Sequence, residues 1–566
     1  MRQSLGRLLR GACLGFLVLA AAPGARATSL SGAYLAAMQA DFRNDYVASA
    51  EYLDRALAID PQNVGLMQNS IVAHVAAGDV AGATGIADRL AEAMPGNQIA
   101  VVVQVSDAIA KEDFAVARDL LDEAGPSVTP LLAGLLSGWV EVGMGDFSAA
   151  QERFDLLKGN AALEAYGQYH KALALALAGD FLSAATILAN GEDGPLHVNL
   201  GALVAHAQVL VQIDRDGEAL EILDEALAGG IPNAVLLDLR DRIAAGENVA
   251  FTRVTNARSG AAEALLTLAD ALSSSESERI GLMHAQLAAY VDPGAVEARL
   301  LAADILEREE QFDLASQALA GVPPESPWYM TAEIRRASTQ SAAGDTEGGI
   351  ATLTDLAAAY PEQIEVQSAL GDALRVAERY GEAAEAYDAA IALVPDPQPV
   401  HWVLYYTRGI SNERAGNWPA AEADFREALV LSPDQPMVLN YLGYSLVEQG
   451  RDLDEALDMI ERAVAGQPDD GYITDSLGWV LYRMGRYEEA VPHMLRAVEL
   501  TPDDPIINDH LGDVLWKVGR IREAEFQWRR ALSFGPAPDL DMDRVRRKLE
   551  VGLDQVISEA GPGTDG

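Results

Sequence analysis

The stretch that decides the fold is Gly471–Leu500, GYITDSLGWVLYRMGRYEEAVPHMLRAVEL, which is followed by TPDD. Small and apolar residues recur in it at helical spacing, first around Leu477 and Gly478 and then around Ala490 and Met494. A glycine stands where the first helix should end, and a Thr-Pro pair stops the second. The pattern predicts a helix–turn–helix pair of 34 residues, and the next 34 residues repeat it at the same offsets.

The small residues in this stretch have a role in packing. Gly478 and Ala490 stand where the two helices of the pair would cross, so the helix axes can approach closely. A bulky side chain at Gly478 should overpack this crossing, at a cost of about 1–3 kcal/mol. One such pair cannot bury its own apolar faces, whereas stacked neighbours can. The alternative, an ordinary amphipathic hairpin, does not explain why the pattern recurs in phase.

The period and the small/large pattern resemble the tetratricopeptide repeat (TPR). The same spacing, followed from the N-terminal part of the chain, finds about fourteen repeats, and the resemblance implies an all-α superhelical solenoid. We expect a signal peptide at 1–27, a degenerate N-terminal solenoid at 28–231, an irregular joint at 232–260, a C-terminal solenoid at 261–538, a capping helix at 539–557 and a disordered tail at 558–566. The joint is either a degenerate repeat with an insertion or a hinge.

Composition and charge agree with a long repeat array and narrow the class of partner. The chain has 566 residues, a length that single globular domains rarely reach, whereas a repeat array can because each unit contacts only its neighbours. The formal net charge is −44. This argues against nucleic acid, whose affinity depends on Lys and Arg, and against an anionic membrane surface. The charge either solvates the surface or selects basic partners.

The N-terminus has the three parts of a signal peptide. Arg2, Arg7 and Arg10 form a positive region before an apolar run, and an Ala-Arg-Ala site predicts cleavage after Ala27. The sequence therefore predicts export to the periplasm or cell envelope. No later stretch reaches 18 uncharged apolar residues, so we expect no integral membrane span after signal removal.

Cleavage at this site would also change the chemistry of the chain. It removes four arginines and no acidic residue, so the net charge goes from −44 to −48. It also removes Cys13, the only cysteine, so the mature chain would have no disulfide or thiol chemistry. The alternative is an outer-membrane lipoprotein attached through Cys13. That alternative is disfavoured because Cys13 precedes the apolar run and Arg10 stands where a lipobox requires leucine.

No catalytic constellation is visible in the sequence. The eight histidines are scattered without an H-E-x-x-H motif, and no P-loop or G-x-G-x-x-G follows a strand. Gly443-Tyr444-Ser445 lacks the second glycine of a nucleophile elbow. We therefore predict a non-catalytic protein–protein interaction scaffold without metal or cofactor, whose partners are proteins or peptides.

The resemblance to TPR proteins also implies a binding site. One stripe of the first helix of each repeat faces the concave groove in that family. In the last three repeats the candidate residues on this stripe are Asn440, Tyr444, Tyr472, Asp475, Trp479, Tyr482, Arg483, Asp509, Asp513, Trp516 and Lys517. Four large aromatic residues among them, Tyr444, Trp479, Tyr482 and Trp516, would supply contact energy, and the aspartates would favour a cation. The alternative is that some of the aromatic rings, Trp516 among them, pack between helices.

A narrower resemblance concerns the C-terminal half. The segments LNYLGYSLVEQGRDLDEALDMIERAV, DDGYITDSLGWVLYRMGRYEEAVPHMLRAVEL and HLGDVLWKVGR, with GAAEALLTLADAL upstream, resemble a family of bacterial TPR lipoproteins. Members act in the periplasm as adaptors that bind a carboxyl-terminal processing protease and its substrates, so the resemblance implies this role. Members are lipidated, whereas the signal here predicts release. The alternatives are a general scaffold for envelope assembly, secretion or polysaccharide export and, less favoured, an enzyme.

Overall fold

A computed structural model describes most of the chain. The described residues are 29–158, 161–190, 196, 199–228, 234–273, 278–537 and 540–560. The predicted signal peptide with its cleavage site after Ala27, Cys13 and the last six residues of the predicted tail lie outside them. Within the described residues there are 31 α-helices, two short 3-10 helices and no strand, so the predicted all-α fold is confirmed.

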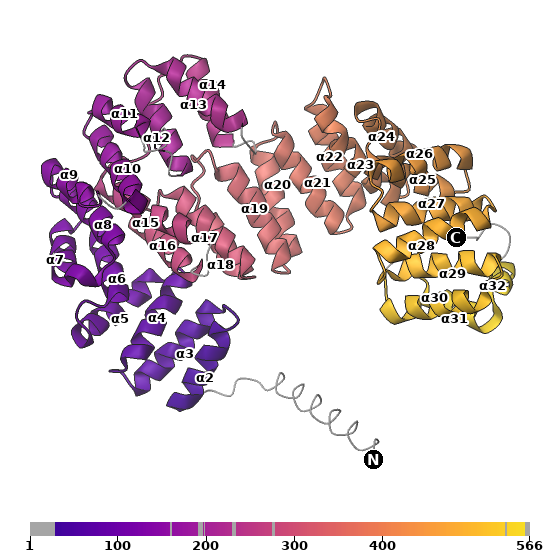
Figure 1. Cartoon of the computed structure of the whole chain (residues 1–566), viewed down its shortest axis with the longest axis horizontal. Helices are drawn as coiled ribbons and strands as arrows, with labels where there is room; N and C mark the ends of the chain where they lie inside the picture. The colour runs from indigo at the N-terminus through magenta and orange to yellow at the C-terminus, as the bar shows by residue number, and fades with distance from the viewer. Residues whose placement is uncertain are drawn as a thin grey trace. The chain divides into compact units, whose positions relative to one another are not determined.

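The chain divides into two compact units between Thr352 and Leu353. The helices that begin in the first unit are α2 (Leu30–Asp41), α3 (Tyr46–Ile59), α4 (Val64–Ala76), α5 (Val80–Ala93), α6 (Gln98–Ala110), α7 (Phe114–Ala124), η2 (Gly125–Ser127), α8 (Pro130–Gly143), α9 (Phe147–Asp155), α10 (Ala161–Leu177), α11 (Phe181–Ala189), α12 (Leu200–Val211), α13 (Asp216–Ala228), α14 (Ala234–Ala244), α15 (Ala257–Leu272), α16 (Glu278–Val291), α17 (Val296–Arg308), α18 (Phe312–Ala320), α19 (Tyr329–Ala342) and α20 (Thr346–Ala359) (Figure 1).

The second unit continues the same pattern. Its helices are α21 (Ile364–Val376), α22 (Tyr380–Ala392), η3 (Pro399–His401), α23 (Trp402–Arg414), α24 (Trp418–Leu431), α25 (Pro436–Glu448), α26 (Leu453–Gly466), α27 (Gly471–Arg483), α28 (Tyr487–Leu500), α29 (Pro505–Lys517), α30 (Ile521–Phe534), α31 (Met542–Val551) and α32 (Leu553–Ala560). Fourteen helix–turn–helix pairs, from α2–α3 to α29–α30, account for all described α-helices except α14, α31 and α32. This agrees with the predicted number of repeats.

The turns within the pairs follow from local backbone chemistry. Gly485 and Gly519 adopt left-handed φ values of 75° and 80° where α27 and α29 end, a conformation that glycine takes without a Cβ clash. In the first unit, aspartates begin the second helices of five pairs by accepting a backbone N–H in the first turn. These N-cap residues are Asp45, Asp79, Asp113, Asp146 and Asp180.

The segment 232–260, predicted as an irregular joint between two solenoids, lies inside the first unit instead. After α14, residues 247–256 form neither a helix nor a strand, and they pack on α12. Gln208 of α12 donates to Thr252 Oγ1 at 2.9 Å and accepts from the Thr252 backbone N–H at 3.0 Å. Val249 and Val254 are buried beside it. The glutamine amide satisfies backbone and side-chain groups of a non-helical segment, which explains its order.

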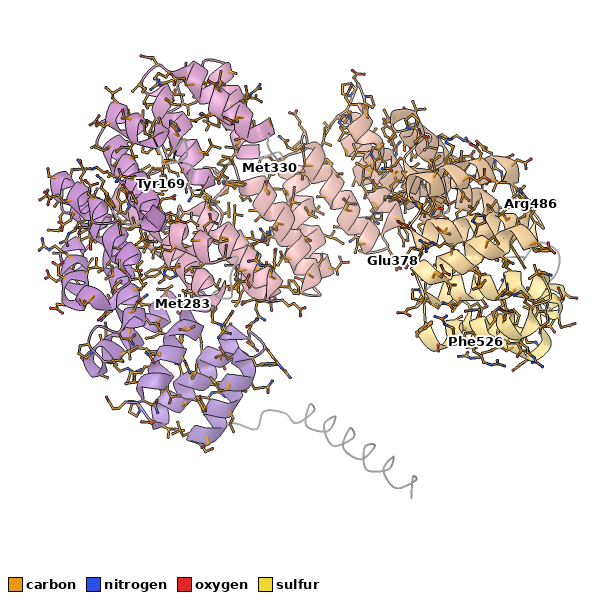
Figure 2. The ribbon with its side chains drawn as sticks, viewed as in Figure 1. Tyr169, Met283, Met330, Glu378, Arg486 and Phe526 are labelled. Carbon is orange, nitrogen blue, oxygen red and sulfur yellow. The ribbon has the colours of Figure 1, made fainter. Side chains whose placement is uncertain are left out.

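The first unit folds back on itself. Helices α15 and α16 contact α4, α6, α8 and α10, which are the first helices of four earlier pairs (Figure 1). The Tyr169 hydroxyl of α10 donates to Glu263 of α15 at 2.6 Å, and the Tyr290 hydroxyl of α16 donates to Asp107 of α6 at 2.8 Å. Tyr169 lies in the interior of this unit (Figure 2) and is fully buried. The first helices of these pairs are therefore covered by later helices of the same chain.

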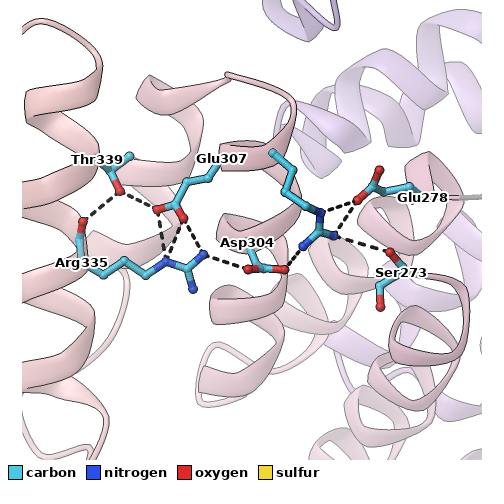
Figure 3. Close-up of polar contacts among 7 residues, drawn as sticks. Ser273, Glu278, Asp304, Glu307, Arg335 and Thr339 are labelled. Atoms are coloured by element: carbon cyan, nitrogen blue, oxygen red, sulfur yellow. Dashed lines mark hydrogen bonds and ion pairs between the residues drawn. The ribbon is translucent and has the colours of Figure 1, made fainter. Parts of the chain in front are cut away.

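Polar contacts also connect successive pairs in the first unit (Figure 3). Arg335 of α19 donates to Glu307 of α17 at 2.9 Å and to Asp304 at 3.2 Å. Asp304 in turn pairs with Arg308, which reaches Glu278 of α16 at 2.7 Å. Three pairs are thus connected by one chain of charged groups. These ion pairs are partly exposed, so each adds little to stability.

The predicted single capping helix at 539–557 is two helices. Gly552 separates α31 from α32 with a φ of 86°, which only glycine adopts without strain. A Cβ at this position would also lie 2.5 Å from the ring of Trp516. The helical structure continues to Ala560, so residues 558–560 of the predicted disordered tail are helical instead.

Candidate protein-binding groove

The second unit has a groove on the face formed by the first helices of its last pairs. The groove has a volume of about 580 Å³, and α25, α27 and α29 supply most of its lining. Equivalent positions on successive first helices point to the same side because the pairs stack with a constant repeat. Leu540, Asp541, Arg544 and Lys548, in and before α31, complete the lining.

Seven of the candidate residues line this groove. They are Asn440, Tyr444, Tyr472, Asp475, Trp479, Asp509 and Asp513. Tyr472 is 58% exposed, whereas Trp479 is 5% exposed. Tyr472 is therefore available for contact, and Trp479 forms part of the wall.

Trp479 is held from three sides. Its ring stacks on His510 at a centroid distance of 4.0 Å and on Tyr482 at 4.7 Å. Its Nε1 donates to Glu448 Oε1 at 2.8 Å, and Arg483 forms an ion pair with the same carboxylate at 3.5 Å. Tyr482 and Arg483 are thus placed behind Trp479 and do not line the groove, contrary to the prediction.

The structure also corrects the position of Trp516 and Lys517. The Trp516 ring packs against Trp528 at 5.4 Å, and its Nε1 donates to Asp554 of α32 at 3.0 Å. Lys517 Nζ donates to the same carboxylate at 2.6 Å. Neither residue lines the groove, because the terminal helices cover this end of α29. For Trp516 the alternative interpretation, packing between helices, is the one the structure supports.

A lysine of the chain itself lies between two of the predicted aspartates. Lys548 of α31 is 2% exposed, and its Nζ donates to Asp509 and to Asp513 at 2.8 Å each. Burial by itself lowers the pKa of Lys548, and the two carboxylates outweigh it, so this pKa is raised. Burial raises the pKa of Asp513, against the effect of Lys548. The sequence predicted a capping helix here but not that its lysine reaches these carboxylates.

Asp475 has a partner that sequence reasoning missed. Its Oδ2 lies 2.8 Å from Nδ1 of His510, which is also buried. Burial lowers the pKa of His510, but the Asp475 charge outweighs it and the pKa is raised above that of a free histidine. The two residues are one repeat apart on α27 and α29, a spacing that no local motif would show.

Metal binding has no evident site in the part of the chain that the structure describes. No group of three or more His, Cys, Asp or Glu side chains there is arranged to hold a metal ion.

None of the described helices combines the length and the apolar run that crossing a membrane requires.

The family comparison covers most of the groove. The tetratricopeptide repeat family model matches residues 334–397, 406–471 and 443–505. In these segments the chain is similar to tetratricopeptide repeats (TPRs). They include α25 and α27, and the last match ends where α29 begins.

Comparisons with single proteins add little to the family match. A TPR repeat-containing protein of Pseudomonas aeruginosa is 38% identical over 87 residues, which are 15% of this chain and 15% of that protein. The Cut9–Hcn1 hetero-tetramer of the APC/C is similar with a TM-score of 0.37 and 15% identity, over 81% of this chain and 96% of that one. A tetratricopeptide repeat protein from Parabacteroides merdae has a TM-score of 0.36 and 14% identity, over 45% of this chain and 97% of that one. Similarities of this size say nothing about function.

Proposed function

We propose that this TPR protein is a non-catalytic scaffold of the bacterial cell envelope that binds a segment of another protein in the groove of its second unit. The observation that carries the proposal is the groove itself, with an exposed tyrosine at its rim and buried acceptor atoms inside it. TPR proteins in general bind proteins or peptides, and most have no catalytic activity of their own.

The distribution of aromatic side chains supports binding in this groove. Tyr472 presents more than half of its surface, and Tyr444 is half-buried beside it. Such rings supply contact area at low cost in conformational entropy. In the first unit, the first helices of four pairs are covered by α15 and α16. The corresponding face of that unit is therefore less available to a partner.

The finer role that we propose is that of an adaptor for a carboxyl-terminal processing protease. Its support is the resemblance of the C-terminal repeats to periplasmic TPR adaptors. The division of the chain into two compact units also fits an adaptor, which must hold a protease and a substrate at the same time. A general scaffold for envelope assembly, secretion or export is the second candidate, and partner identity separates the two.

The experiment is a pull-down from periplasmic extract with the chain that begins at Thr28. The wild type is compared with a double variant, Tyr444→Ala with Tyr472→Ala, and with Phe526→Ala as control. Phe526 lies on α30 outside the groove and is 57% exposed, a value close to that of Tyr472 (Figure 2). The adaptor role predicts that a processing protease and its substrates co-purify, and that at least one of them is lost only in the double variant.

Two results would contradict parts of this proposal. If only assembly, secretion or export proteins co-purify, the adaptor role is wrong and the scaffold remains. If the double variant retains every partner of the wild type, the groove is not the binding site.

A further inference from the structure

Three buried acceptor oxygens in the groove have no hydrogen-bond donor within the described residues. They are Oδ1 of Asn440, Oδ1 of Asp475 and Oδ1 of Asp509, one from each of α25, α27 and α29. All three residues line the groove, and Asp475 is only 5% exposed. Buried acceptors are nearly always paired in native proteins, so an unpaired set on one groove indicates that a ligand brings the donors.

The chain's own cations do not satisfy these atoms. Lys548 donates to Oδ2 of Asp509, and His510 is paired with Oδ2 of Asp475, so the Oδ1 atom of each carboxylate is left without a donor from the described chain. The lining as a whole is acidic. Seven carboxylates and four basic side chains contribute to it: Glu413, Glu448, Asp475, Asp504, Asp509, Asp513 and Asp541 against Arg414, Arg544, Lys548 and His510.

We propose that the groove recognises its protein partner through lysine or arginine side chains, whose cationic groups donate to the Oδ1 atoms of Asn440, Asp475 and Asp509. An ammonium or guanidinium group has only donors, which matches a set made only of acceptors. The aliphatic part of such a side chain would lie along the aromatic wall of Tyr444 and Trp479. This inference rests on the proposed function and adds the chemistry of the partner.

Charge complementarity decides between kinds of segment. An acidic or C-terminal carboxylate segment would meet an acidic lining and three acceptors that cannot donate to it. A neutral amide could donate, but it would add no positive charge to a lining in which seven carboxylates outnumber four basic side chains. The occupant is therefore a basic side chain within a segment that also has an apolar residue for Tyr472 at the rim. The acidic chain as a whole would attract such a segment.

The experiment uses an array of short random-sequence peptides, acetylated and amidated so that their termini carry no charge, with the chain from Thr28. The best binders are then resynthesised with citrulline in place of arginine or norleucine in place of lysine. We expect each selected peptide to contain a basic residue, and its neutral version to bind at least about tenfold more weakly. Copies of these peptides that have a free N-terminal amine and no basic side chain test whether an N-terminal ammonium group is the cation that binds.

Protein variants complete the test. Asp475→Asn with Asp509→Asn should weaken the basic peptide by at least about tenfold and should leave its neutral version nearly unchanged. Glu488→Gln, which removes an exposed carboxylate of α28 outside the groove, should change neither. Circular dichroism and thermal unfolding check that each variant is folded.

The outcomes separate the two proposals. If no peptide binds the wild type, the proposed groove function itself fails. If peptides bind but neutral versions bind as well, if only a free amine is recognised, or if the double variant weakens both versions equally, the inference about a basic side chain is overturned and the groove function stands.

Discussion

Gly260 of α15 lies against the indole ring of Trp139 of α8. A Cβ built on Gly260 would be 2.2 Å from Cε3 of that ring. The ring is fully buried, and its Nε1 donates to His170 of α10 at 3.0 Å, so it has no room to move. Only glycine allows α15 to approach α8 this closely. The contact helps to hold the first unit in its folded-back form.

The first prediction concerns this contact. Gly260→Ala should lower the free energy of unfolding of the first unit by about 1–3 kcal/mol, because the ring must shift within a packed interior. Hydrogen–deuterium exchange should report it as faster exchange in α8 and α15. Gly217→Ala on α13 is the matched control, since nothing lies within 4 Å of a Cβ there. Equal behaviour of the two variants would mean that the helices are not in this close contact.

The second prediction compares two glycines of the second unit. A Cβ on Gly512 would lie 2.4 Å from the Trp528 ring, and one on Gly478 would lie 2.7 Å from Cγ of Met494. The ring is rigid and fixed by a hydrogen bond to Asp513 at 2.8 Å, whereas methionine can change rotamer. Gly512→Ala should therefore cost about 1–3 kcal/mol and Gly478→Ala less. Protection from hydrogen–deuterium exchange in α29 and in α27 measures the two losses of stability. A larger loss of protection for Gly478→Ala would contradict the prediction.

The third prediction separates stability from binding. Trp479→Ala removes a buried ring that is stacked on two neighbours, so it should destabilise the second unit by about 3–5 kcal/mol. Tyr472→Ala removes an exposed ring and should change stability by about 0.5 kcal/mol or less. Thermal unfolding and partner binding are measured on both. Only Tyr472→Ala is expected to lose partner affinity while it stays as stable as the wild type.

The fourth prediction concerns Lys548. Lys548→Met leaves Asp509 and Asp513 without their cation in a buried site, which should cost about 3–5 kcal/mol. Arg546→Met is the control on the same helix, because Arg546 is largely exposed and its ion pair is with the exposed Asp543. Exchange in α29 and α31 should rise in the first variant and not in the second. If α29 keeps its protection, the ion pairs do not hold the terminal helix.

The fifth prediction is a pH dependence of the first unit. Burial, aided by the nearby Arg253 charge, lowers the pKa of His170 to about 3, against 6.5 for a free histidine. Below pH 6.5 the unfolded chain binds a proton that the folded chain does not. This contribution to stability is therefore complete above pH 6.5 and is lost as the pH falls toward 3. We expect a loss of about 2 kcal/mol between pH 6.5 and pH 5.

The control for this titration is His170→Gln. Glutamine keeps an acceptor for Trp139 but does not titrate, so the variant should lose less stability over the same pH range. Exchange of α10, corrected for the intrinsic effect of pH, measures both proteins. His510 affects stability in the opposite direction, because its pKa is raised in the folded chain. Its contribution to stability is complete below the pKa of a free histidine and is lost as the pH rises through the folded-state pKa. An unchanged pH profile in His170→Gln would assign the titration to other groups.

The helical pairs could be predicted because their determinants are local. Gly478 at the crossing and Gly485 at the turn act within one repeat of 34 residues, so spacing alone identifies them. Part of the groove was also accessible, since Tyr472 and Asp475 follow from their positions on one stripe of α27. Trp516 could not be placed in this way, because its partner Asp554 lies on a helix beyond the last repeat.

The sequence by itself determined the repeat, the all-α class and the stripe from which the groove is built. Only the tertiary structure decided that α15 and α16 cover the earlier helices, and that Lys548 pairs with Asp509 and Asp513. The reason is physical. A repeat fixes contacts between neighbours, whereas closure at Gly260 and capping by α31 join residues far apart in the chain, and their fit depends on shape and burial that no local pattern encodes.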